Sequence, residues 1–328
     1  MEQKVLRVST VVLVCSLLLR LMSTGVFADL FSFSLSSNTA AWMIFLQTGR
    51  FVRPAEIVFR PTPQESTAST EPEATQPTEE SVLTFSPALA EGLALTCSFS
   101  YSADLPALLS KPLSWELTGD APTVLILHSH ATESFAGDYE ETSPYHTTDT
   151  TQNMVSIGKY IALRLEEAGI KVLHDTTLHD APSYNAAYGS SRQSAADYLE
   201  QYPSIKLILD LHRDSFEDED GNQIVQTVFS EGEVLAPVML VVGTSYGGLE
   251  HPNWRENLAL ALKLQIQMES LRPGICRKIN LRSQRFNQDL STGALLVEVG
   301  ASGNSHAQAL KSADVLADAI LSLAHGSR

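Results

Sequence analysis

The sequence predicts an α/β fold in which a mostly parallel sheet is flanked by helices, and two observations support this prediction. Short apolar runs recur from residue 122 onward, and each is apolar enough for a strand that is buried on both faces. Segments with helical spacing lie between these runs, and strands that alternate with helices are typical of βαβ units. The predicted strands are residues 124–127, 170–173, 205–209, 238–242 and 295–299.

Three helices are predicted between or after these strands. Each has apolar residues three or four positions apart, the spacing that places them on one face of a helix. The first helix ends at Gly169 and the third at Gly326, because glycine commonly follows a helix end, and the second begins after Asn253. The apolar positions are Met154, Ile157, Ile161 and Leu165 in the first helix, Leu258, Leu262 and Ile266 in the second, and Ala309, Ala313, Leu316, Ile320 and Leu323 in the third.

The N-terminal segment, residues 1–28, predicts export of the chain. Lys4 and Arg7 precede a mostly apolar stretch, residues 8–28, which is about as long as a bilayer core is thick. Two interpretations remain open. A cleavable signal peptide would use residues 8–19 as its apolar region, whereas a single-pass anchor would let Arg20 reach toward the interface. The anchor is favoured because residues 41–46 are apolar again, and either way the basic residues predict that the body lies outside the cytoplasm.

Four further regions follow this segment. Residues 29–60 are predicted to be membrane-proximal, residues 61–85 a linker, residues 86–121 an extension, and residues 122–328 the main folded domain. The linker prediction rests on residues 61–81, which hold four prolines and five glutamates but no Lys or Arg. Such a segment cannot bury enough apolar surface to offset its ordering entropy, so we expect a disordered tether.

The overall charge excludes one class of partner. The chain has 22 Lys and Arg residues against 38 Asp and Glu residues, which gives a net charge of −16. A surface of this sign repels a polyanion instead of neutralising its phosphates. Nucleic acid is therefore not an expected partner.

The three cysteines suggest no chemistry. Cys15, Cys97 and Cys276 match no CxxC pattern, and a disulfide scaffold would need more of them. A single bond between Cys97 and Cys276 remains open, but buried free thiols are the favoured interpretation.

Three of the predicted strands end in residues that bind metals or move protons. His130 and Glu133 follow the strand at 124–127, His212 follows the strand at 205–209, and Glu298 lies on the strand at 295–299. Since the carboxyl ends of strands in an α/β sheet border one crevice, distant residues can converge there. Two imidazoles and one carboxylate, with an open fourth position, are typical of catalytic zinc. We therefore predict a zinc hydrolase with His130, Glu133 and His212 as ligands.

Neighbouring residues receive supporting roles. Glu298 is the predicted general base, because a carboxylate on an apolar strand is partly desolvated and poised toward neutrality. Asp210 is a candidate hydrogen-bond partner of the ligand His212. Arg213 could clamp a substrate carboxylate or pair with Asp214. His128 remains an alternative ligand to His130, although only His130 has the HxxE spacing, and His146 is a reserve ligand. Tyr184, Tyr188 and Arg192 are predicted to pack and to cap a helix.

A competing motif points to a serine hydrolase. Residues 243–247 read GTSYG and match the G-x-S-x-G nucleophile elbow, with Ser245 as the nucleophile. The elbow requires a helix directly after the turn, but residues 247–252 separate the motif from the predicted helix. Asp289 and His306 could complete a triad, so this alternative stays open as the less favoured one.

Five strings resemble one family: VLILHSHATESF at 124–135, SYNAAYGSSRQS at 183–194, IKLILDLHRDS at 205–215, HPNWRENLALALKLQ at 251–265 and FNQDLSTGALLVEVG at 286–300. They resemble the stage II sporulation protein P family of peptidoglycan hydrolases from endospore formers. The resemblance implies a fold similar to zinc amidases and zinc carboxypeptidases, whose HxxE, later His and late Glu match His130, Glu133, His212 and Glu298. The family more often shows HTHTSES where this chain has HSHATES, and that difference touches neither ligand.

The resemblance also implies a role. It indicates a zinc-dependent N-acetylmuramoyl-L-alanine amidase that cuts between N-acetylmuramic acid and L-Ala, with stem-peptide cross-links as a second possible target. It implies work during engulfment beside the sporulation proteins D and M, at the mother-cell membrane facing the forespore. A non-catalytic module that binds peptidoglycan as a scaffold is the rival interpretation, and the intact set of four residues argues against it.

Overall fold

The computed structural model describes residues 85–101, 103–113, 116–137, 145–181 and 183–325. The predicted anchor at 1–28, the segment at 29–60 and the linker at 61–85, except for Phe85, lie outside these ranges and stay predictions. Within the ranges, no helix combines the length and the apolar character that a membrane span needs.

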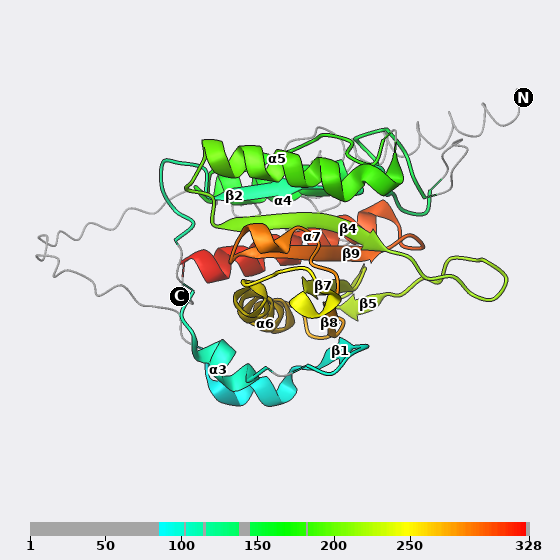
Figure 1. Cartoon of the computed structure of the whole chain (residues 1–328). Helices are drawn as coiled ribbons and strands as arrows, with labels where there is room; N and C mark the ends of the chain where they lie inside the picture. Colours follow the sequence, from blue (N-terminus) through cyan, green and yellow to red (C-terminus); the bar gives the residue numbers. More distant parts are fainter. Residues whose placement is uncertain (1–84, 102, 114–115, 138–144, 182, 326–328) are drawn as a thin grey trace, which may run out of the picture. The chain divides into compact units, whose positions relative to one another are not determined.

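A seven-stranded sheet runs through the described part of the chain, in the order β1-β8-β7-β9-β4-β2-β3 (Figure 1). Neighbouring strands pair in parallel except β7 and β9, which are antiparallel. The prediction of a mostly parallel sheet is therefore confirmed. The strands are β1 (Leu95–Cys97), β2 (Val124–Leu127), β3 (Val172–His174), β4 (Leu207–Asp214), β7 (Val238–Gly243), β8 (Ile279–Arg282) and β9 (Ala294–Ala301).

Helices flank this sheet, as the alternating pattern predicts. They are α3 (Leu105–Ser110), α4 (Met154–Glu167), α5 (Ala187–Gln201), α6 (Trp254–Leu271) and α7 (His306–His325). Helix α7 contacts α4 and α6, so these three form one layer (Figure 1). Ala195 of α5 packs with Leu125 and Leu127 of β2. A separate antiparallel hairpin joins β5 (Val228–Ser230) to β6 (Glu233–Leu235).

The predicted extension at 86–121 joins the sheet instead of merely leading to it. After the 3-10 turn η2 (Pro87–Gly92), strand β1 pairs with β8 at the sheet edge. Helix α3 follows and is tied to α6, since the buried Lys263 Nζ donates to Leu108 O at 3.0 Å. Cys97 and Cys276 are free thiols, as favoured, and each is half-buried, not fully buried.

The sheet order explains why the candidate residues converge. Strand β4 lies between β2 and β9, so the three strands that carry them are direct neighbours. Leu127 is the register partner of Asp210, and His212 is the register partner of Glu298. A register shift between His212 and Asp214 ends the regular pairing just beyond the site.

Candidate active site

The HxxE segment forms a tight turn directly after β2. The Glu133 N–H donates to His130 O at 3.2 Å, which closes the turn and brings both side chains to one side. The Met154 N–H, at the start of α4, donates to Glu133 O at 3.0 Å and anchors the turn to the helix. His130 and Glu133 are buried. Their spacing of three residues is thus converted into spatial proximity by one local hydrogen bond.

His212 of β4 completes a group with these two residues. Its ring centroid lies 5.4 Å from that of His130. Its Nδ1 lies 3.5 Å from Glu133 Oε2. His130 Nδ1 is buried and has no hydrogen-bond partner among the described residues. The structure therefore brings the three predicted ligands into one cluster and leaves a ring nitrogen in it unsatisfied.

Asp210 lies between His212 and Ser129 and contacts both residues. Its Oδ1 lies 3.0 Å from His212 Nε2, and it accepts hydrogen bonds from the Ser129 backbone N–H at 2.7 Å and from Ser129 Oγ at 2.6 Å. Burial alone would lower the pKa of His212, but Asp210 and Glu133 on either side raise it well above its ordinary value. The position of Asp210 matches its predicted role as a partner of His212.

Arg213 fixes the carboxylate of Glu133. Its backbone N–H donates to Glu133 Oε2 at 3.1 Å, and its Nη1 donates to Oε1 at 3.3 Å. Its other donors reach the backbone oxygens of Ser134 and Tyr145 at 3.0 and 2.8 Å, and the side chain is only 6% exposed. The predicted pair with Asp214 is not formed, because Asp214 binds Arg277 at 2.6 Å. The donors of Arg213 are therefore directed at Glu133 and at two backbone oxygens of the protein.

Glu298 lies beside this cluster on β9. Its Oε2 is buried and has no hydrogen-bond partner among the described residues. Burial raises the pKa of Glu298 to about 8; His212 and Arg213 oppose this rise, and the negative charges of Glu133 and Asp214 add to it. A carboxyl group with this pKa can exchange a proton near neutral pH, which is the property a general base needs.

His128 and His146, the alternative ligands, lie differently. Both ring nitrogens of His128 face protein partners, with Nδ1 3.2 Å from Leu211 O and Nε2 2.9 Å from His174 Nε2. Burial, with the neighbouring His174, lowers the pKa of His128 to about 3. His146 contacts Thr132 Oγ1 and Arg213 Nη2, both at 3.2 Å. His130 is thus the histidine of the turn that retains a free buried nitrogen.

Two tyrosines lie over the histidines of the cluster. The sequence predicts only packing and helix-capping roles for these tyrosines. Tyr184 stacks on His130 with ring centroids 4.0 Å apart, and Tyr188 lies parallel to His212 at 6.2 Å. Burial raises the pKa of Tyr188, and the charges of Asp210, Glu298 and Glu133 raise it further. The available clue is the spacing of four residues between Tyr184, in the 3-10 turn η3 (Tyr184–Ala186), and Tyr188, near the start of α5, because such a spacing places both rings on one side of a helical segment.

The serine-hydrolase alternative finds no assembled triad. Ser245 is exposed in the 3-10 turn η4 (Ser245–Gly247), and α6 begins only at Trp254, as the spacing predicts. His306 contacts Ser156 Oγ at 2.6 Å, and Asp289 binds Arg192 at 2.8 Å. In the described ranges, no hydrogen bond joins Ser245 to a histidine. Ser245, Asp289 and His306 therefore do not form a catalytic triad, because each has different surroundings.

The HxxE pattern implies a zinc ion at this cluster. Among the described residues, no three His, Cys, Asp or Glu side chains are already drawn around one point as metal ligands. The donor types nevertheless match those of a catalytic zinc site, since two imidazoles and one carboxylate are gathered here. His130 Nδ1 has no hydrogen-bond partner in the described part of the chain, and His212 Nδ1 lies 3.5 Å from Glu133 Oε2. Asp210 and Arg213 hold two of these donors in place, as partners of metal ligands generally do.

With this geometry described, the comparisons with known proteins decide the family. Residues 58–321 match the family described as Stage II sporulation protein P (SpoIIP). This chain belongs to the SpoIIP family. A curated relative, Stage II sporulation protein P of Bacillus subtilis (strain 168), is 29% identical over 215 residues. That match covers 62% of this chain and 51% of the relative, so the chain spans about half the length of the relative.

Solved structures give distant matches in addition to the SpoIIP relative. The N-acetylmuramoyl-L-alanine amidase AmiC2 of Nostoc punctiforme is 14% identical with a TM-score of 0.39, over 62% of this chain and 97% of that one. The amidase Ami1 of Mycobacterium abscessus is 13% identical with a TM-score of 0.37, over 62% and 99%. Membership of the SpoIIP family rests on the sequence match, not on these structures.

Proposed function

We propose that this chain is a peptidoglycan hydrolase of sporulation that cuts the amide between N-acetylmuramic acid and L-Ala. The observation that carries the proposal is the convergence of His130, Glu133 and His212 with Glu298, whose buried oxygen has no partner among the described residues. Membership of the SpoIIP family supports the substrate class. Cleavage of stem-peptide cross-links is a second candidate reaction at the same site.

The proposed cofactor is one zinc ion held by His130, Glu133 and His212. Bound there, zinc would lower the pKa of a coordinated water and polarise the scissile carbonyl. The chain's own contribution is orientation. Arg213 holds both oxygens of Glu133, and Asp210 faces the far nitrogen of His212, so two of the three donors cannot rotate freely.

Glu298 is the proposed proton carrier. Its carboxylate takes a proton from the attacking water and gives it to the leaving nitrogen of L-Ala. A pKa of about 8 makes the carboxyl group a stronger base than an exposed glutamate and still able to release the proton afterwards. The rings of Tyr184 and Tyr188 cover the histidines and limit the access of bulk water to this exchange.

The place of action is proposed from the sequence alone. Lys4, Arg7 and the apolar residues 8–28 support a single-pass anchor in the mother-cell membrane, with the domain outside the cytoplasm and facing the forespore. The acidic residues 61–85 would tether the domain to that anchor. The sporulation proteins D and M are the proposed partners.

The direct test is digestion of purified peptidoglycan by the full chain, followed by mass spectrometry of the fragments. Free stem peptides that begin with L-Ala are expected, and shortened cross-links would reveal the second reaction. Removal of zinc with a chelator should stop the release, and added zinc should restore it. Ser245→Ala should keep full activity; full activity after chelation, with loss in Ser245→Ala, would replace this mechanism by the serine one. Binding of peptidoglycan without any cleavage would favour the scaffold alternative.

A further inference from the structure

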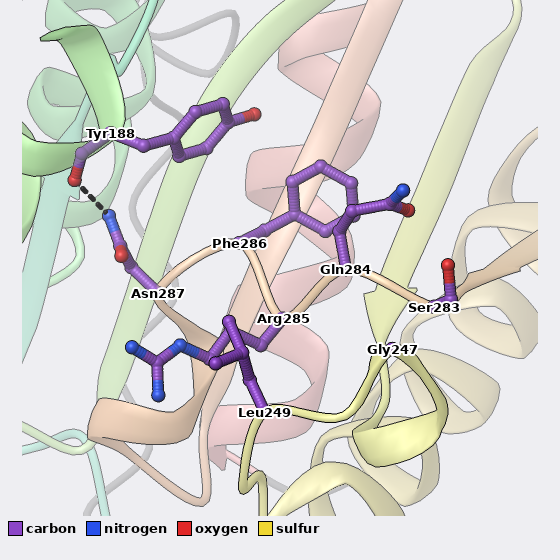
Figure 2. A pocket seen from close by; sticks show the side chains of 8 residues that line it. All are labelled: Tyr188, Gly247, Leu249, Ser283, Gln284, Arg285, Phe286 and Asn287. Carbon is purple, nitrogen blue, oxygen red and sulfur yellow. Dashed lines mark hydrogen bonds between the residues drawn. The ribbon is translucent and has the colours of Figure 1, made fainter.

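A cavity of about 410 Å³ lies beside the candidate active site and has no role in the chemistry described above. Tyr188 connects the two. One side of its ring faces His212 at 6.2 Å, and Phe286, on the cavity wall, lies 5.7 Å from it. Figure 2 shows the lining side chains, with Tyr188 and Phe286 in the upper part of the view and Leu249 below them. Tyr188 therefore borders both the histidine cluster and the cavity.

The wall of this cavity is held in an unusual backbone conformation. Phe286 and Asn287 have φ angles of 50° and 59°, in the left-handed region that non-glycine residues rarely adopt. Asn287 Nδ2 donates to Tyr188 O at 2.8 Å and to Ser191 Oγ at 3.2 Å, which ties the strained segment to α5 (Figure 2). Such strain persists only where the surroundings enforce it, and it is concentrated at functional sites.

Among the described residues that line the cavity, Arg285 is the one with a charged side chain, and its partner Asp289 lies behind the lining. Arg192 binds Asp289 through two hydrogen bonds of 2.9 and 2.8 Å, and Arg285 Nη1 lies 3.3 Å from the same carboxylate. Burial opposes ionisation of Asp289, but these arginines lower its pKa, so it stays charged. One carboxylate against two guanidinium groups leaves one net positive charge. In a chain of net charge −16, this local excess favours an anionic group on the ligand.

Apolar groups supply the rest of the surface. Leu249 is 58% exposed, and the rings of Phe286 and Tyr188 also line the cavity. A ligand that combines a carboxylate with short aliphatic parts fits this surface better than an uncharged sugar does. The stem peptide of peptidoglycan has this character, because its second residue, D-Glu, carries a free carboxylate next to an aliphatic chain.

We propose that this cavity binds the stem peptide, with Arg285 receiving the free carboxylate of the residue that follows L-Ala. The assignment rests on the proposed function, which places L-Ala at His212. In this assignment Arg285 binds the substrate carboxylate, a role that the sequence suggests for Arg213. Donors of Arg213 are instead directed at Glu133. Arg285 is then a specificity residue that distinguishes stems with a free carboxylate from amidated stems.

The test compares two ligands that differ by this one charge, N-acetylmuramoyl-L-Ala-D-Glu and N-acetylmuramoyl-L-Ala-D-isoglutamine. Both are titrated calorimetrically into the full chain carrying Glu298→Gln, in detergent with zinc, so that no turnover occurs. The acid is expected to bind about tenfold more tightly than the amide at low salt. Arg285→Gln in the same background should remove that difference. Arg255→Gln is the matched control, because its exposed cation lies over Trp254 and does not line this cavity.

Each other outcome overturns the proposal. Equal affinity for the two ligands, binding of neither, or a preference that survives Arg285→Gln would each remove the proposed carboxylate site. In the active enzyme, Arg285→Gln should raise KM for acidic stems with kcat unchanged, since the contact is remote from the reacting bond. The proposed function fails separately, if the unmodified full chain releases no stem peptide from peptidoglycan at all.

Discussion

Gly158 offers the sharpest test of how the fold supports the site. It lies in the middle of α4, where alanine would normally be favoured over glycine by about 1 kcal/mol. A Cβ at this position would lie 2.5 Å from His128 Nε2 and 2.7 Å from His174 Nε2. Ordinary contacts between such atoms are about 3.5–4.0 Å, so both rings would have to move.

The rings cannot move without losing hydrogen bonds. Their Nε2 atoms are 2.9 Å apart, and His128 Nδ1 is 3.2 Å from Leu211 O. Overpacking of a core costs about 1–3 kcal/mol, and a buried polar group left without its partner costs about 1–3 kcal/mol more. After the gain of about 1 kcal/mol from helix propensity, we expect Gly158→Ala to lower the free energy of unfolding by about 1–5 kcal/mol.

Gly189 provides the matched control in another helix. It lies within α5, is exposed, and would place a Cβ with no atom within 4 Å. Gly189→Ala should therefore stabilise the protein by about 0.5–1 kcal/mol. Urea denaturation of both variants and the unchanged chain measures the two effects. If Gly158→Ala were as stable as the unchanged protein, the tight contact between α4 and the two histidines would be refuted.

Three further changes test separate parts of the site. Glu298→Gln should lower the rate of stem-peptide release by about 10²–10⁴-fold, the range for a general base, with zinc content unchanged in metal analysis; loss of zinc would show that Glu298 is a ligand. Arg213→Lys should also reduce release and zinc affinity, because an ammonium cannot reproduce the three side-chain donors that reach Glu133 and two backbone carbonyls. An unchanged zinc affinity would contradict that role. For His174, burial lowers the folded-state pKa to about 4, so from pH 6.5 downward the unfolded chain binds a proton that the folded chain does not. Stability should then fall by about 1 kcal/mol per pH unit between pH 6 and 4.5, and His174→Gln should reduce that slope; equal slopes in the two proteins would disprove the assignment.

The sequence predicts the strands that consist of an unbroken apolar run. It does not predict the strands in which apolar and polar residues alternate or which are very short. Strands β2, β7 and β9 were expected within one or two residues, because both of their faces are buried. Strand β8 alternates buried Ile279 and Leu281 with more exposed residues, and β1 has only three residues at the sheet edge. Neither produces an apolar run, so neither could be recognised without its partner. The start of β3 is two residues later than expected because Ile170 still bonds to Leu165 O at the end of α4.

The same distinction applies to the candidate site. Residues placed by the strands themselves were predictable, since His212 and Glu298 are register partners on adjacent strands. The direction of a long side chain was not. Arg213 could have faced solvent or substrate, and only the fold shows its guanidinium against Glu133. The spacing of four residues between Tyr184 and Tyr188 indicates that their rings share one side, but only the fold shows that they lie over the histidines.

The GTSYG segment shows how one pattern can arise from a different physical need. In a nucleophile elbow the glycines relieve a strained turn around the serine. Here they permit contact between two loops. A Cβ at Gly243 would lie 2.5 Å from Gln284 O, and one at Gly247 would collide with the backbone of Ser283. These two loops form walls of the cavity that contains Arg285. The glycines of the motif are therefore explained by the close approach that shapes this cavity, and the exposed Ser245 between them requires no catalytic role.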